Sequence, residues 1–312
     1  MGKDIGKWLS DLPVVKDLVG WMKRIKLPGF EGLSLFDFWE LYSAGIVKGT
    51  FSTRASAIAF SFFMAIFPFF LFVLNLIPFV PINNFQVEFL TFVEGLLPAQ
   101  TADFFRPILY DIAGNQQAGL LSTTFLFAIF LMANGVNAIF TGFEYSYHIT
   151  VNRSVIKQYF VALGVSLILA LIFLTAVGII VYYQLSIARL KVDDLFFQEK
   201  DWISEVGTFI FFISLIFTIV GTLFYFGTKQ GREFRFFSAG ALMTTLLFLL
   251  TTYLFGIYIN NFSNYNEIYF SLASILILMV YIWLNSNLLL LGFELNAVLH
   301  HLREKRNKKR VA

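Results

Sequence analysis

Six long apolar stretches constrain this chain more than any other feature. A helix needs about 20 mainly apolar residues to cross the hydrocarbon core of a bilayer. The stretches that meet this length are about 55–79, 119–141, 159–183, 205–227, 236–259 and 268–292. Only 14% of the residues are charged, whereas a soluble domain carries roughly 25%. The sequence therefore predicts an all-α fold, a polytopic transmembrane helical bundle with six spans.

The basic residues predict how this bundle is oriented. If the N-terminus is cytoplasmic, all but four of the 23 Lys and Arg residues fall in cytoplasmic segments. The four on the other face are Arg106, Arg189, Lys191 and Lys200. Lys and Arg accumulate in cytoplasmic loops of membrane proteins. We therefore expect both termini in the cytoplasm.

This orientation divides the chain into three parts. Residues 1–33 form a cytoplasmic segment, 34–302 the membrane domain and 303–312 a basic cytoplasmic tail. The tail has two interpretations, a stop-transfer anchor or a contact with anionic lipid head groups.

Amphipathic stretches outside the spans predict interfacial helices. Apolar residues recur at helical spacing in 34–50, which favours a helix along the inner membrane surface. The loop at 85–113 carries similar stripes, and we expect interfacial helix there, with a simple amphipathic loop as the alternative. Within the first span, Pro68 predicts a kink, because proline removes a backbone hydrogen bond.

A polar pattern recurs at the ends of the second and sixth spans. Both contain N-x4-G-F-E, which places Asn137 seven residues before Glu144 and Asn287 seven residues before Glu294. Seven residues are about two helical turns, so each amide shares a helix face with its acid. Both spans run in the same predicted direction, so the two motifs lie at similar depth. The candidate polar residues are Arg54, Asn134, Asn137, Glu144, Asn285, Asn287, Glu294 and Asn296.

Two interpretations of these residues stay open. In one, the amides hold helices together and the acids are paired at the membrane edge, with Arg54, Arg153 or the tail as counter-charges. In the other, the same residues line a water-accessible cavity that opens to the cytoplasm, because polar groups within spans usually face a pathway or the bundle interior.

Several chemistries have no candidate residues in this sequence. There is no P-loop, so we expect no ATPase in this chain. The H-E-x-x-H and G-x-S-x-G motifs are missing, and there is no Cys. A basic, aromatic surface of domain size for nucleic acid is also missing. We therefore expect a protein that is not an enzyme, with no cofactor or metal and no nucleic-acid partner.

Three apolar segments carry a resemblance to a known family: TRASAIAFSFFMAIFPFFLFVL, FRFFSAGALMTTLLFLLTTYLFGIYINNF and LLLLGFELNAVL. With them the chain resembles the YihY/BrkB family of bacterial inner-membrane proteins, over about residues 35–302. Its most specific elements are Phe67 with Pro68, and Gly292 with Glu294 and Asn296. Phe270 departs from the usual Gly, and Ala239 stands where Pro is often seen.

This resemblance implies a function in the bacterial cytoplasmic membrane. It implies a multi-pass protein tied to envelope integrity, with a role in lipid transport. Some members carry the old name ribonuclease BN, for which this sequence has no nuclease motif. We expect membrane lipids and other envelope proteins as partners, with no ATPase in this chain. The alternative is a non-transporting envelope-integrity scaffold or partner subunit. The oligomeric state is left open.

Overall fold

The computed structural model describes residues 13–26, 34–36, 39–40, 43, 51–76, 87, 90–91, 106–107, 110, 118–146, 149, 153–193, 201–229, 236–262 and 270–311. Within these ranges every named element is a helix, which confirms the all-α prediction. The helices are α2 (Pro13–Arg24), α4 (Phe51–Leu76), α7 (Ala118–Glu144), α8 (Val155–Asp193), α9 (Asp201–Gly227), α10 (Ala239–Phe262) and α11 (Phe270–Val311).

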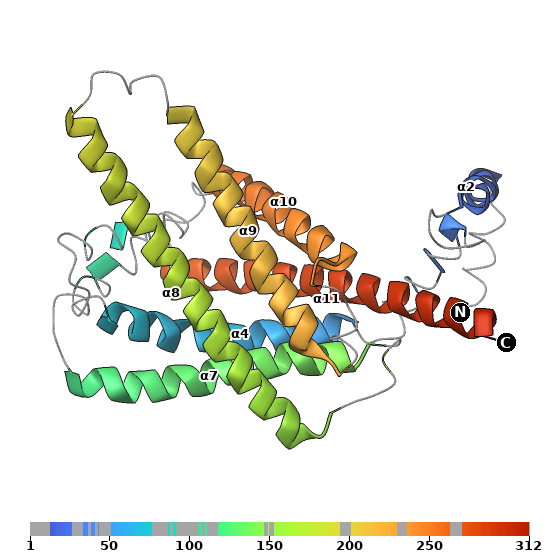
Figure 1. Cartoon of the computed structure of the whole chain (residues 1–312), viewed down its shortest axis with the longest axis horizontal. Coiled ribbons are helices and arrows are strands. Elements are labelled where there is room, and N and C mark those ends of the chain that lie inside the picture. Colours follow the sequence, from blue (N-terminus) through green and yellow to red (C-terminus); the bar gives the residue numbers. More distant parts are fainter. Residues whose placement is uncertain are drawn as a thin grey trace.

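The six long helices pack in a closed sequence of neighbours. Each of α4, α7, α8, α9, α10 and α11 packs against the next, and α11 returns to pack against α4. Figure 1 shows α4, α7 and α11 running in a similar direction, while α8, α9 and α10 cross them obliquely. The start of α4 and the ends of α7 and α9 therefore gather at one end of the bundle, where α11 passes them.

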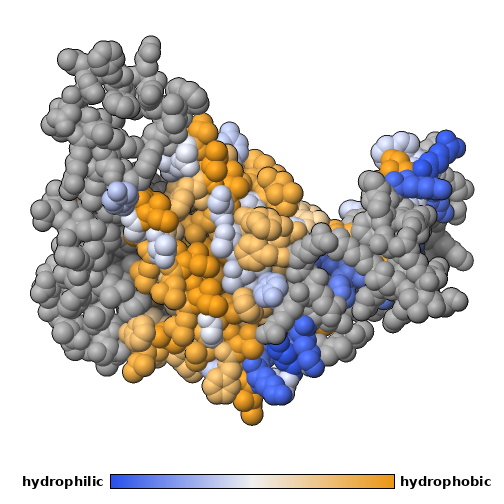
Figure 2. Space-filling view, viewed as in Figure 1, coloured by the Kyte–Doolittle hydropathy of each residue, from blue (hydrophilic) through white to orange (hydrophobic). Residues whose placement is uncertain are grey.

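Five segments are long and apolar enough to cross a membrane. They are Phe125–Glu144, Val155–Ile180, Val206–Gly227, Ala239–Tyr258 and Ile275–Leu302. The apolar stretch found in α4 is shorter, Phe51–Ile66, although the helix itself has 26 residues. Large apolar side chains are exposed over the middle of the molecule, as the orange surface in Figure 2 shows. Five spans are thus supported, while the six-span count and the orientation stay predictions.

Two helices extend beyond the predicted spans. Helix α8 continues to Asp193, and α11 continues through the basic tail to Val311. The residues that extend α11 are rich in Leu, Glu, Lys and Arg, which are strong helix formers. The tail is therefore the last part of a 42-residue helix.

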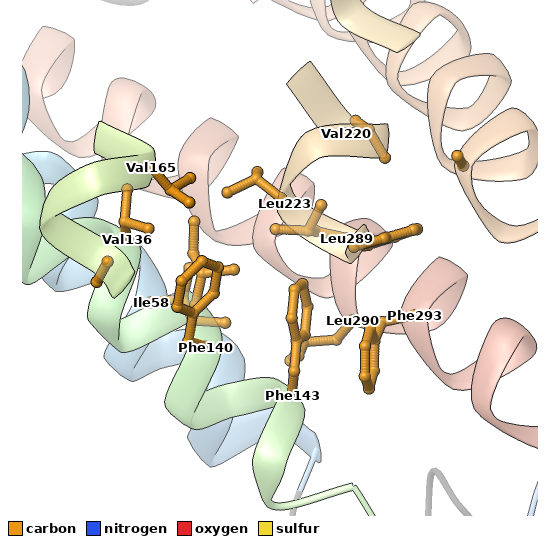
Figure 3. Close-up of a cluster of buried hydrophobic side chains, with 14 of the residues drawn as sticks. Ile58, Val136, Phe140, Phe143, Val165, Val220, Leu223, Leu289, Leu290 and Phe293 are labelled. Atoms are coloured by element: carbon orange, nitrogen blue, oxygen red, sulfur yellow. The ribbon is translucent and has the colours of Figure 1, made fainter. Parts of the chain in front are cut away.

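An aromatic cluster lies where α7, α9 and α11 meet. The rings of Phe143 and Phe293 stack with centroids 4.1 Å apart and an interplanar angle of 6°. Phe224 meets both rings edge-on, at 5.5 Å and 5.8 Å. Figure 3 shows Phe143 and Phe293 within the buried cluster that also contains Leu289 and Leu290. Close packing of this kind holds membrane helices together, because burial from water supplies little driving force within lipid.

Helices α10 and α11 cross at two glycines. A Cβ atom added to Gly292 would overlap the side chain of Thr244 and lie 2.8 Å from the Gly240 carbonyl oxygen. A Cβ atom added to Gly240 would overlap the Gly292 carbonyl oxygen and approach Asn296. Small residues at such crossings let two backbones approach closely. The glycines therefore fix the position of α10 against α11.

Several predictions concern residues that are only partly described. Residues 35–36, 39–40 and 43 are helical, and the rest of the predicted helix at 34–50 lies outside the described residues. In the predicted interfacial segment 85–113, residues 87, 90–91, 106–107 and 110 are helical. Pro68 lies inside α4, and its predicted kink stays a prediction.

Candidate functional site

The two G-F-E motifs come together at the end of the bundle. Besides the stacked phenylalanines, Gly142 lies against Leu290 of α11 and Ile58 of α4. The two motifs, which the sequence predicted to lie at similar depth, are thus side by side. The charged residues of this region lie on α4, α7 and α11, and one more, Arg153, lies just before α8.

Glu294 is the most deeply buried acid of the site, with 0% of its surface exposed. The hydroxyl group of Ser146, just after α7, donates a hydrogen bond of 2.7 Å to Glu294 Oε2. The carboxylate also lies close enough to Arg54 to act on it electrostatically. Ser146 follows the motif by two residues, and its polar partner on α11 could not be recognised from sequence spacing.

Arg54 lies in the first turn of α4 and is 6% exposed. Its Nη1 donates a hydrogen bond of 2.8 Å to the Gly142 carbonyl oxygen, near the C-terminal end of α7. The guanidinium carbon lies 5.7 Å from the ring centre of Phe51. Neither Nε nor Nη2 of Arg54 finds a hydrogen-bond partner in the described part of the chain, and both are buried. Both donors on this edge of the guanidinium thus have no acceptor among the described residues.

Glu144 belongs to a second polar group that connects α7 to α8. It accepts a hydrogen bond of 3.0 Å from the backbone N–H of Arg153. The Gln158 amide, oriented so that both its ends are satisfied, donates to Glu144 Oε2 at 2.7 Å and accepts from the Thr141 hydroxyl at 2.8 Å. Asn137 Oδ1 lies 3.1 Å from the same amide. Gln158 lies in the first turn of α8, and its polarity at the start of an apolar helix was the only signal for it in the sequence.

Arg153 closes the C-terminal end of α9. Its Nη1 donates to the Phe226 carbonyl oxygen at 2.6 Å, and its Nη2 donates to the Thr228 carbonyl oxygen at 2.8 Å. The last carbonyl groups of a helix have no partner within the helix, and a cation there also interacts favourably with the helix dipole. Arg153 therefore has a clear structural role.

Asn296 has a similar role at the start of α10. Its Oδ1 accepts from the Gly240 N–H at 2.8 Å, and its Nδ2 donates to the Ser238 hydroxyl at 2.9 Å. The first N–H groups of a helix need acceptors from outside it. A side chain of α11 thus supplies a cap to α10 where the two helices cross.

The remaining predicted amides do not join these groups. Asn285 Nδ2 donates to the Tyr281 carbonyl oxygen at 2.8 Å, and Asn287 Nδ2 donates to the Trp283 carbonyl oxygen at 2.7 Å, both within α11. Asn134 is half-buried in α7. Asn137 and Asn287 thus use different partners, on α8 and within α11. The polar stripe divides into a Glu294–Arg54 group, a Glu144–Gln158 group and local bonds.

The family model for the virulence factor BrkB matches residues 44–312. The chain belongs to this family. The match confirms the resemblance seen in the sequence and includes every candidate polar residue from Arg54 to Asn296.

Two relatives of this BrkB-family chain show how it compares with individual proteins. A protein of Bacillus subtilis (strain 168), named as the ribonuclease-like protein YfkH, is 28% identical over 251 residues, which is 80% of this chain and 90% of that protein. A UPF0761 membrane protein of Glaesserella parasuis serovar 5 (strain SH0165) is 31% identical over 191 residues, 60% of this chain and 64% of that protein. No solved structure gives a significant match.

Apolar grooves lie between helices in the described part of this BrkB-family bundle. One of ≈ 400 Å³ lies between α8 and α9, with Ile172, Ala176 and Leu215 among its lining residues. The hydroxyl groups of Thr175, Ser214 and Thr218 along it donate to carbonyl groups one turn earlier in their own helices. A second groove of ≈ 380 Å³ lies between α10 and α11. Both grooves therefore present mainly apolar surface.

No group of three or more His, Cys, Asp or Glu side chains that could hold a metal ion gathers among the described residues. The charged groups of the site are instead two acids and two arginines, Glu144 with Arg153 and Glu294 with Arg54.

Proposed function

We propose that this BrkB-family protein handles a lipid or another amphiphile in the bacterial cytoplasmic (inner) membrane, without an ATPase of its own. In this proposal both termini are cytoplasmic, and the protein acts as a passive conduit or flippase-like element, not as an enzyme. Its partners are membrane lipids and other envelope proteins, and it needs neither a cofactor nor nucleic acid.

The observation that carries the proposal is the edge of the Arg54 guanidinium that has no acceptor among the described residues. Buried polar groups in proteins are nearly always hydrogen-bonded, and an exception calls for an explanation. Arg54 is buried within a bundle end, and its Nε and Nη2 lack acceptors among the described residues. The two donors of one guanidinium edge match the oxygens of a phosphate or carboxylate. An anionic lipid head group would supply these oxygens.

Glu294 gives this site a means of release. Its carboxylate acts on Arg54 and competes with an anionic head group for the same cation. A site that must pass its ligand on cannot bind it too tightly. The apolar grooves beside α8 and α10 offer surface that matches acyl chains.

The alternative function, a non-transporting envelope scaffold, also has a specific observation in its favour. Arg153 and Asn296 complete the ends of α9 and α10 and thereby fix how the helices meet. Polar bonds of this kind contribute about 0.6–2 kcal/mol each to helix association in membranes. In a scaffold, the whole polar group would serve this purpose, and Nε and Nη2 of Arg54 would bind no ligand.

The amount of anionic lipid that stays bound to the purified protein distinguishes the transport proposal from the scaffold. We expect Arg54→Lys to keep the charge but to lose the planar fork, so that one charge-assisted bond worth about 1.5–3 kcal/mol is lost and retention of anionic lipid falls about tenfold or more. The measurement is the amount and identity of phospholipid that co-purifies with the full chain in a mild detergent, by mass spectrometry.

Arg153→Lys is the matched control. It makes the same chemical change at an arginine whose guanidinium is committed to the carbonyl groups of α9. We expect it to lower stability and to leave lipid retention per folded molecule unchanged. Equal retention by the wild type and Arg54→Lys would favour the scaffold.

A further inference from the structure

The N-terminal helix α2 is strongly amphipathic and lies outside the bundle. Its sequence is PVVKDLVGWMKR, with Lys23 and Arg24 in the last turn. Figure 1 shows α2 nearly end-on, beyond the end of the bundle to which α11 extends, whereas α4, α7 and α11 run across the view. The helix therefore lies across the direction of these helices. Trp21 on this helix is 60% exposed, a high value for a large apolar side chain.

Helix α2 forms a small unit with the segment that follows it. The Leu35 N–H donates to the Ile25 carbonyl oxygen at 2.8 Å, and Lys26 and Ser34 form an isolated antiparallel bridge. The Lys23 ammonium lies 4.9 Å from the ring centre of Phe36. Trp39, a few residues on, is 55% exposed. The unit thus presents two exposed tryptophans.

The charges of α2 and of the two residues that follow it are mostly basic. Lys16, Lys23, Arg24 and Lys26 are basic, and between Pro13 and Lys26 only Asp17 opposes them. Figure 2 shows hydrophilic residues gathered over the α2 unit. Tryptophan side chains prefer the level of the lipid head groups, and clustered Lys and Arg residues are attracted to anionic lipid.

We propose that α2 binds the surface of an anionic bilayer, lying in its plane with Trp21 and Met22 among the head groups and its basic residues toward lipid phosphates. Charge complementarity selects this partner: a basic amphipathic helix with exposed tryptophan matches an anionic lipid surface better than an apolar protein groove. The proposal does not depend on lipid transport, since α2 is separate from the Arg54 site.

The absence of Cys in the chain allows a direct test. Met22→Cys and Arg24→Cys place single spin labels two residues apart, roughly 200° around the helix and so on opposite faces. The full-length protein is studied in nanodiscs of phosphatidylcholine, with and without phosphatidylglycerol. The accessibility of each label to oxygen, which is enriched in lipid, is compared with its accessibility to a water-soluble nickel complex.

The expected result is a lipid-immersed label at Met22 and a water-exposed label at Arg24 in the anionic discs. Changing Lys26 to Gln should lower the surface-binding equilibrium about fivefold, because each basic residue near an anionic surface contributes a comparable factor. Two water-exposed labels in both lipids would overturn the proposal, as would a Met22 label shielded from both reagents by protein. Equal immersion in discs without phosphatidylglycerol would overturn its anionic specificity.

Discussion

Arg54→Met is expected to destabilise the protein by about 3–5 kcal/mol, because it removes a cation that balances a buried carboxylate. Glu294 is fully buried, and it interacts electrostatically with Arg54. The change also removes the bond to the Gly142 carbonyl oxygen and so loosens α4 from α7. The measurement is the thermal unfolding midpoint of the purified protein, with the yield of monodisperse protein as a second measure.

The double variant Arg54→Met with Glu294→Met separates charge from packing. An ion pair replaced as a whole by apolar side chains of similar size is often neutral or stabilising. We therefore expect the double variant to recover most of the stability lost in Arg54→Met alone. A double variant as unstable as the sum of the two single variants would contradict the coupling of Arg54 with Glu294.

Gly292→Ala is the second change with a large expected effect. The added methyl group would overlap Thr244 and press on the Gly240 carbonyl oxygen, so α10 must move away from α11. Overpacking of this kind costs about 1–3 kcal/mol, and more where backbone must shift. The cap that Asn296 supplies to Gly240 would be disturbed by the same movement. A lower unfolding midpoint, measured in the same way, is the expected result.

Gly256→Ala on α10 is the matched control. A Cβ atom at Gly256 would meet nothing within 4 Å. Alanine is a better helix former than glycine by about 1 kcal/mol, so this variant should be neutral or slightly stabilised. Adding Thr244→Ala to Gly292→Ala should restore part of the lost stability. Equal midpoints for Gly292→Ala and Gly256→Ala would show that the close crossing is unimportant.

Hydropathy predicted the helices well, since the length of an apolar run is a local property. Each predicted stretch coincides with one helix from α4 to α11. The extension of α11 through the tail was missed, because a charged segment with high helix propensity can continue a helix or leave it. Helix α2 was missed for a similar reason, as its amphipathic pattern is short.

The candidate site was predicted in part. Spacing and direction brought the motifs of Glu144 and Glu294 to one level, and their phenylalanines indeed stack. The partners Ser146 and Gln158 were missed, because they depend on how each helix is rotated about its axis. The same rotation separates Asn137, which contacts Gln158, from Asn287, which bonds within α11. A single sequence does not specify that rotation.

The central claim, that the Arg54–Glu294 group takes part in moving a lipid, is tested most directly in proteoliposomes. A fluorescent anionic phospholipid is placed in both leaflets, and a membrane-impermeant reductant removes the fluorescence that reaches the outer leaflet. The variants are Glu294→Gln, which keeps size and an acceptor for Ser146 but removes the charge, and Glu304→Gln, the same change further along α11. Both are compared at equal folded yield.

We expect wild-type protein and Glu304→Gln to move the lipid faster than protein-free vesicles do. Glu294→Gln should be slower by about tenfold or more, because loss of a charged competitor worth about 1.5–3 kcal/mol leaves the head group held by Arg54. Wild-type vesicles no faster than protein-free vesicles, or Glu294→Gln at the wild-type rate with normal yield, would contradict the account.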